Sequence, residues 1–143
     1  MKKVFVNGYG TIGSRIAKFI KDDSDIVVIG IGKHSPDEKV QHAINDGFSV
    51  YVPEDKNDNF KDYNISGSIE SILDNCDLVI DASPGGKGFL NKKNIYESRG
   101  IKAIFQGGET IFNNNTFITP GFWSNQVDNL SLITDSTMNL TSD

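Results

Sequence analysis

The sequence predicts an α/β fold with a doubly wound, mostly parallel sheet. Residues 4–13 combine a strand-like run, a glycine-rich turn and the start of a helical run. Strand-like and helical segments then alternate as far as about residue 106. The strand-like runs are continuously apolar rather than alternating, which is typical of strands that are covered on both faces.

The first strand and the turn after it carry the strongest functional signal. Gly8, Gly10 and Gly13 form a Gly-x-Gly-x-x-Gly string between a strand and a helix. Gly8 permits the tight turn, Gly10 lets backbone approach a pyrophosphate, and Gly13 lets the helix pack on the strand. Thr11 and Ile12 begin the helix, whose amide groups and dipole favour an anion. The pattern predicts a Rossmann dinucleotide site; the alternative is a turn whose glycines serve only for turning.

The next elements follow from periodicity and capping residues. A polar helix is expected from Pro36 to about residue 45, with Ser35 as its cap and an end at 46–47. The second strand precedes it at residues 26–31. The helix after the glycine turn is expected to bury one apolar face, made of Ile12, Ile16, Phe19 and Ile20.

The rest of the chain continues the alternation and then becomes irregular. Ser68 is expected to cap a short helix. Further strands are expected at 48–53, 77–82 and 102–106, a loop-like stretch at 54–64, a helix at 89–98 that Gly100 closes, and two short strands within 116–119 and 130–134.

Composition limits the classes of function. A net charge of −5 does not suit a phosphate backbone, so a nucleic-acid partner is not expected. One cysteine cannot form an internal disulfide, and no apolar stretch is long enough to span a membrane. The two histidines lack the spacing of metal ligands, so no metal site is expected. We expect a single domain over residues 1–143, located in the cytoplasm without a membrane partner.

The residues after the second strand indicate the kind of dinucleotide. In open α/β sheets the ligand lies outside the carboxyl ends of the strands. Lys33 stands where NAD-preferring folds usually place an acidic residue. Its charge would attract a 2′-phosphate, and Ser35 and His34 would donate hydrogen bonds. NADP is therefore favoured, with NAD as the alternative cofactor; the lysine could otherwise be an ordinary solvated turn residue.

Two later turns complete the predicted cofactor site. Ser83 and Pro84 follow one strand, and Gly107 and Gly108 follow the next. Backbone in such turns must either approach a ligand closely or bend sharply. We expect these four residues beside the nicotinamide half of the cofactor, and simple turns are the alternative.

Five blocks of sequence resemble a known family. The blocks at residues 7–13, 33–36, 51–53, 81–84 and 104–109 occur in the order and at the intervals of archaeal glyceraldehyde-3-phosphate dehydrogenase. The resemblance covers residues 1–110 well and 111–143 loosely. It implies the N-terminal NAD(P)-binding domain of a phosphorylating, tetrameric enzyme that oxidises its aldehyde in a second domain.

The departures from this family concern catalysis. The resemblance implies a cysteine nucleophile after a strand, but Asp135 or Ser136 stands at that place, and neither replaces a thiolate well. Cys76 precedes the strand expected at 77–82, at the end of the sheet opposite the ligand site. The family's catalytic domain is missing too, so we expect no catalytic residue and no activity alone. For activity, the chain would need that catalytic domain or a homo-oligomer. The alternative is a non-catalytic nucleotide-binding module or regulatory subunit.

Overall fold

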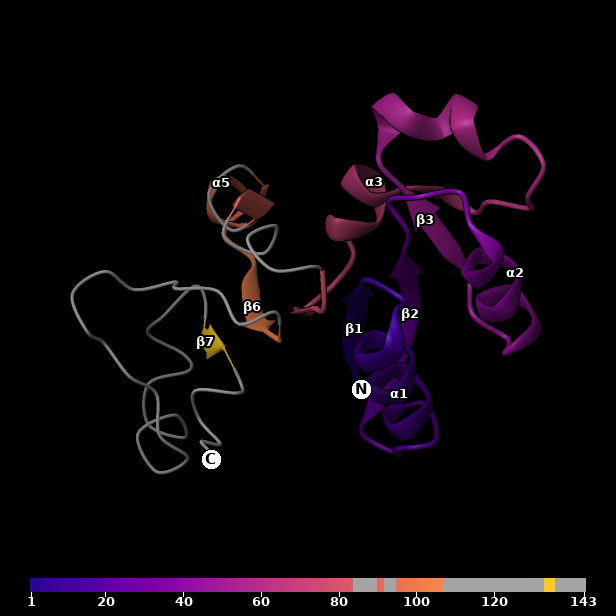
Figure 1. Ribbon diagram of the computed structural model, residues 1–143. Coiled ribbons are helices and arrows are strands. Elements are labelled where there is room, and N and C mark those ends of the chain that lie inside the picture. Colours follow the sequence, from indigo (N-terminus) through magenta and orange to yellow (C-terminus); the bar gives the residue numbers. More distant parts are fainter. Residues whose placement is uncertain (84–89, 92–94, 107–132, 136–143) are drawn as a thin grey trace.

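The computed structural model describes residues 1–83, 90–91, 95–106 and 133–135 (Figure 1). Its centre is a seven-stranded sheet in the order β4-β3-β2-β1-β5-β6-β7, in which every neighbouring pair is parallel. The chain winds outward from β1 in both directions, which confirms the predicted doubly wound fold. The strands are β1 (Lys2–Asn7), β2 (Ile26–Gly32), β3 (Val50–Val52), β4 (Gly67–Ser68), β5 (Leu78–Asp81), β6 (Lys102–Phe105) and β7 (Ile133–Asp135).

Helices cover both faces of the sheet. Val4 and Val6 on β1 pack into a cluster with residues of α1 and α2, whereas Phe5 packs into a cluster with α3 and Tyr96. Successive residues of a strand point to opposite faces, so β1 is buried on both sides, as its continuous apolarity predicts. The helices are α1 (Thr11–Ile20), α2 (Glu38–Asn45), the 3₁₀ helix η1 (Glu54–Phe60), α3 (Ile69–Leu73) and α5 (Glu97–Arg99).

The predicted buried face of α1 is wrong for two of its four residues. Ile12 is 49% exposed and Phe19 is 86% exposed, whereas Gly13 and Ala17 are buried. A Cβ atom on Gly13 would lie 2.0 Å from the carbonyl oxygen of Gly8. The helix therefore lies so close to the glycine turn that its small residues must face the sheet, which rotates the apolar stripe toward solvent.

The start of α2 also differs from the prediction. Asp37, rather than Ser35, is the N-cap, and its side chain accepts a hydrogen bond from the backbone amide of Lys39 at 3.0 Å. The predicted end is confirmed: Asp46 is the C-cap, and Gly47 follows with a φ of +93°. An aspartate is as good an N-cap as a serine, so the sequence offered two starts and the structure uses the second.

Most other elements agree with the sequence. Ser68 caps α3 by accepting from the amide of Ser71 at 3.1 Å, as predicted. The stretch expected to be loop-like contains η1, because Phe60 is fully buried and anchors it. Gly100 ends α5 in the left-handed conformation, with a φ of +67°. The strand expected at 116–119 lies outside the described residues, and no described helix is long and apolar enough to span a membrane.

Candidate functional site

A cleft of about 500 Å³ lies at the carboxyl ends of β1, β2 and β5, where the strand order reverses. Such a switch point is the usual ligand site of a doubly wound sheet. The structure brings together eight of the twelve residues that the sequence predicts as cofactor-binding: Gly8, Gly10, Thr11, Ile12, Lys33, His34, Ser35 and Ser83. Pro84, Gly107 and Gly108 lie outside the described residues, and Gly13 does not line the cleft.

The three glycines of the turn have different roles. Gly8 has a φ of +125°, and a Cβ atom there would lie 2.8 Å from the backbone of Ala82. Gly13 allows the close approach of α1 to Gly8 described above. Gly10, in contrast, has nothing within 4 Å of the position of a Cβ atom. The space beside Gly10 is therefore open to a ligand, whereas Gly8 and Gly13 serve the packing of the turn.

The start of α1 borders this open space. Gly10 is the N-cap with extended backbone, and no side chain accepts a hydrogen bond from the first turn. The first turn also contains no acidic residue. The first amide groups of a helix lack intrahelical partners and carry partial positive charge, so an uncapped start favours an anion. The arrangement fits a pyrophosphate on the amide groups near Thr11 and Ile12.

A buried cation lies on the β2 side of the cleft. Lys33 is only 6% exposed, and its backbone amide donates to the carbonyl of Tyr51 at 2.9 Å. Its Nζ atom lies 2.8 Å from Oδ1 of Asp37. Burial raises the pKa of the Asp37 carboxyl, but the hydrogen bond and charge of Lys33 outweigh it, so the pKa lies below its ordinary value. The Asp37 carboxyl is therefore ionised near neutral pH.

A chain of hydrogen bonds between buried side chains fixes His34 beside the cleft. The amide nitrogen of Asn7 donates to the hydroxyl of Tyr96 at 2.8 Å, and that hydroxyl donates to Oδ2 of Asp81 at 2.5 Å. The amide oxygen of Asn7 therefore faces Nε2 of His34, 2.8 Å away. Since that oxygen only accepts, Nε2 carries the proton in this contact. All of Asn7, Tyr96 and Asp81 are fully buried.

The same network holds the turn after β5. Asp81 accepts from the backbone amide of Ser83 at 3.0 Å and from the amide nitrogen of Asn91 at 2.9 Å. Asn91 also donates to the hydroxyl of Ser83 at 3.2 Å. Burial, and then the negative charge of Asp81, raise the pKa of the Tyr96 hydroxyl well above its ordinary value. Tyr96 thus stays a neutral donor, and the turns after β1, β2 and β5 are tied to one another.

Sequence reasoning missed several members of this site. Asn7 and Asp81 were detectable, because each is a polar residue at the carboxyl end of an apolar strand. Tyr96 gave no signal, because it lies 89 residues from Asn7 along the chain. Asp37 and Lys39 also line the cleft, because Asp37 is the N-cap of α2 and Lys39 lies in its first turn, whereas the sequence predicted a helix that began at Pro36.

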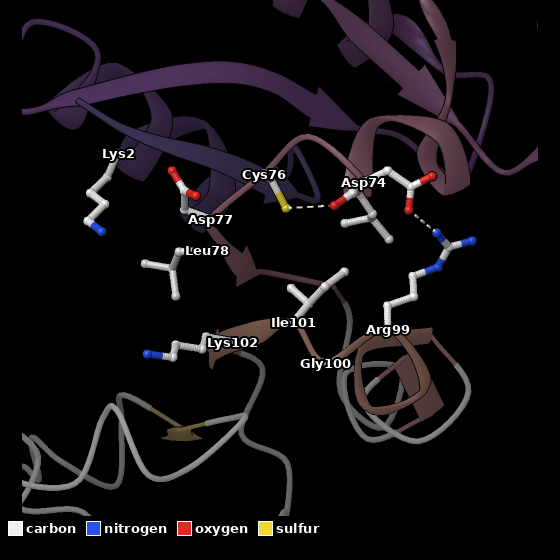
Figure 2. Close-up of a pocket in the computed structure, with 10 residues that line it drawn as sticks. Lys2, Asp74, Cys76, Asp77, Leu78, Arg99, Gly100, Ile101 and Lys102 are labelled. Atoms are coloured by element: carbon white, nitrogen blue, oxygen red, sulfur yellow. Dashed lines mark hydrogen bonds and ion pairs between the residues drawn. The ribbon is translucent and has the colours of Figure 1, made fainter.

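A second and larger cavity, of about 590 Å³, lies at the amino ends of β5 and β6 (Figure 2). It contains Cys76, which precedes β5 at the end of the sheet opposite the cleft, as predicted. Burial, and then the charge of Asp77, raise the pKa of the thiol to about 11. Arg99 pairs with Asp74 there at 2.6 Å. A thiol with so high a pKa is a poor nucleophile near neutral pH.

Among the described residues, neither cavity brings together a set of metal ligands. Within the part of the chain that the structure describes, no three His, Cys, Asp or Glu side chains come together to hold a metal ion. The cleft offers amide groups, one half-buried ion pair and hydrogen-bond donors with which to hold a ligand.

The chain was compared with known proteins. No family model matches it. It is 42% identical over 113 residues to a glyceraldehyde-3-phosphate dehydrogenase of Methanobacterium bryantii, an alignment that covers 76% of this chain and 33% of the relative. It is 44% identical over 109 residues to the enzyme of the same name from Sulfolobus acidocaldarius, covering 75% and 32%. The enzyme of Methanothermus fervidus is 44% identical over 112 residues, covering 76% and 33%.

This chain is homologous to the N-terminal region of archaeal glyceraldehyde-3-phosphate dehydrogenases. The alignments lie in the N-terminal region of the relatives, which confirms the resemblance seen in residues 1–110. The chain spans about a third of the length of the relatives that it matches. A Rossmann-type sheet in a homologue of these dehydrogenases indicates a nicotinamide dinucleotide as the class of cofactor. The open space at Gly10 and the uncapped start of α1 fit such a ligand.

Proposed function

We propose that the cleft binds NADP in preference to NAD, and that the chain is the cofactor-binding domain of an enzyme that oxidises an aldehyde. One observation carries the proposal: the open space at Gly10 stands directly before an uncapped helix start, at the switch point of the sheet. An anion there would replace the missing cap, and a bulky cap or side chain would have prevented it.

Ten of the twelve predicted residues then have a direct role in holding the cofactor, whereas Gly8 and Gly13 serve the packing of the turn. The amide groups near Gly10, Thr11 and Ile12 bind the pyrophosphate. Lys33 attracts the 2′-phosphate, and the loop that follows it, with His34 and Ser35, surrounds the ribose. Ser83, with Pro84, Gly107 and Gly108, borders the nicotinamide. A bound nicotinamide ring would accept a hydride, and these residues would position the ring and exclude water.

The proposal extends to the domain organisation and the location of the protein. Residues 1–143 form one dinucleotide-binding domain located in the cytoplasm. The aldehyde-binding site, the nucleophile and the general base are supplied by a catalytic domain or by a partner chain. The homologues' name supports this assignment, because those proteins are glyceraldehyde-3-phosphate dehydrogenases.

A second candidate function is nucleotide binding without catalysis. Asp135 on β7 stands where the family resemblance implies a cysteine, and the single cysteine lies at the other end of the sheet with a raised pKa. A chimera of residues 1–110 with the catalytic region of the Methanothermus fervidus relative separates the two. NADPH formation from glyceraldehyde 3-phosphate supports the first candidate; binding of NADPH without turnover supports the second.

Calorimetric titration with NADPH and NADH side by side tests the cofactor site. The Lys33→Met variant keeps the apolar stem and removes the charge, so NADPH should bind about ten-fold more weakly while NADH binding changes little. Lys61→Met is the matched control, because Lys61 is exposed beyond η1 and outside the lining of the cleft. Equal loss of both cofactors in Lys33→Met, or no loss of either, would contradict a role in 2′-phosphate binding.

A further inference from the structure

We propose that Asp37 sets the cofactor preference of this cleft, because its carboxylate forms an ion pair with the ammonium group of Lys33, to which a 2′-phosphate would otherwise bind. The inference rests on the proposed function, since it concerns the same site. It adds a residue that opposes NADP to a site in which Lys33 favours it.

The geometry of the ion pair places Asp37 on the ligand side. The side chain of Lys33 is 8% exposed and that of Asp37 is 41% exposed, and both residues line the cleft. Their charged atoms are 2.8 Å apart. A phosphate that approaches Lys33 from the cleft therefore meets the carboxylate at the same time as the ammonium group.

The carboxylate cannot easily move aside, because it has a second task. Oδ1 of Asp37 also accepts from the backbone amide of Lys39 at 3.0 Å and so caps α2. Rotating the side chain away from Lys33 would uncap the helix, which costs about 1 kcal/mol. The lowered pKa of this carboxyl keeps it ionised at neutral pH.

Asp37 therefore acts differently on the two cofactors. A 2′-phosphate carries nearly two negative charges, and a fixed carboxylate within a few ångströms repels it. The 2′-hydroxyl of NAD is neutral and can donate a hydrogen bond to a carboxylate. Lys33 and Asp37 thus pull the preference in opposite directions, and removal of one charge exposes the effect of the other.

Asp37→Asn is the direct test. Asparagine caps helices as well as aspartate and has the same size, so α2 is retained while the charge is lost. We expect NADPH to bind about five-fold more tightly at low ionic strength, with NADH unchanged or weaker. The gain should shrink in 0.5 M NaCl, because salt screens the removed repulsion. Asp37→Ser, which also keeps a capping oxygen, provides a second variant if the first folds poorly.

Asp58→Asn in η1 is the control for a general change in net charge, because Asp58 is exposed and outside the lining of the cleft. It should leave the ratio of the two dissociation constants unchanged. An unchanged or lowered preference for NADPH in both Asp37 variants would overturn the inference while leaving the proposed function intact. A wild-type chain that binds neither cofactor would overturn the proposed function and this inference with it.

Discussion

The two ends of the sheet both carry a cavity, and only one has the features of a dinucleotide site. At the carboxyl ends, open space beside Gly10 meets an uncapped helix start, and buried side chains fix the surrounding turns. At the amino ends, the cavity is larger, but Arg99 is paired with Asp74 and the Cys76 thiol is protonated near neutral pH. The difference teaches that the chemistry of the lining, rather than volume, marks a binding site in this fold.

The rigidity of the carboxyl end has a clear origin. Asn7, Asp81 and Tyr96 are buried polar groups that satisfy one another. Buried polar groups without partners are destabilising, so this set holds its geometry only as a whole. The amino end has no comparable set among the described residues that line it; its ion pair is partly solvated and contributes little.

The largest expected effect comes from Gly13→Ala. The added methyl group would overlap the carbonyl of Gly8, so α1 must shift, and we expect a loss of about 3 kcal/mol in the free energy of unfolding. Urea denaturation measures it. Gly10→Ala is the matched variant: it should unfold like the wild type yet bind NADPH about ten-fold more weakly, because the methyl group enters the open space. Equal stability of the two variants would contradict the roles given to these glycines.

The next effect is expected from Tyr96→Phe. Loss of the hydroxyl removes one buried hydrogen-bond partner from Asp81 and one from Asn7, which should lower the free energy of unfolding by about 2 kcal/mol. His34 loses the fixed orientation of Asn7, so NADPH binding should weaken as well. Tyr63→Phe is the control: Tyr63 is only partly buried and packs against the other core cluster. A Tyr96 variant as stable as this control would show that the network adds nothing to the fold.

The smallest effect concerns the amino end and pH. The pKa of Cys76 is raised in the folded chain from 9.0 to about 11, so the folded state prefers the neutral thiol. Its contribution to stability is complete below pH 9 and is lost as the pH rises toward 11. Because the thiol is partly exposed, we expect a loss of only about 1 kcal/mol relative to Cys76→Ala. Parallel stability curves for wild type and variant across this range would contradict the raised pKa.

The sequence predicted the carboxyl end better than the helix surfaces around it. The glycine turn, the strand before it and Lys33 were recognisable because their spacing reflects local backbone geometry. The face of α1 was not, because the buried side is decided by the contact of Gly13 with Gly8 rather than by the apolar stripe of Ile12 and Phe19. The local sequence pattern shows which residues could form the buried face of a helix, but tertiary contacts decide which of them are buried.

Long-range pairing explains what else was missed. Lys33 was recognised as a cation, but its pairing with Asp37 depended on where α2 begins, and Ser35 was an equally good cap. Tyr96 joins Asn7 and Asp81 only because β1 and β5 are neighbours in the sheet. No spacing in the sequence predicts the contact of Tyr96 with Asn7 and Asp81. Polar residues at the ends of apolar strands do indicate where the site lies.

An NMR titration of the isotope-labelled full chain with NADPH tests the central claim most directly. If a dinucleotide binds at the carboxyl ends, the amide resonances of Gly8, Gly10, Thr11 and Lys33 should shift saturably. Those of Cys76 and Lys102 at the amino ends should stay in place. Shifts centred on the amino-end cavity, or no saturable shift at millimolar NADPH, would contradict the account.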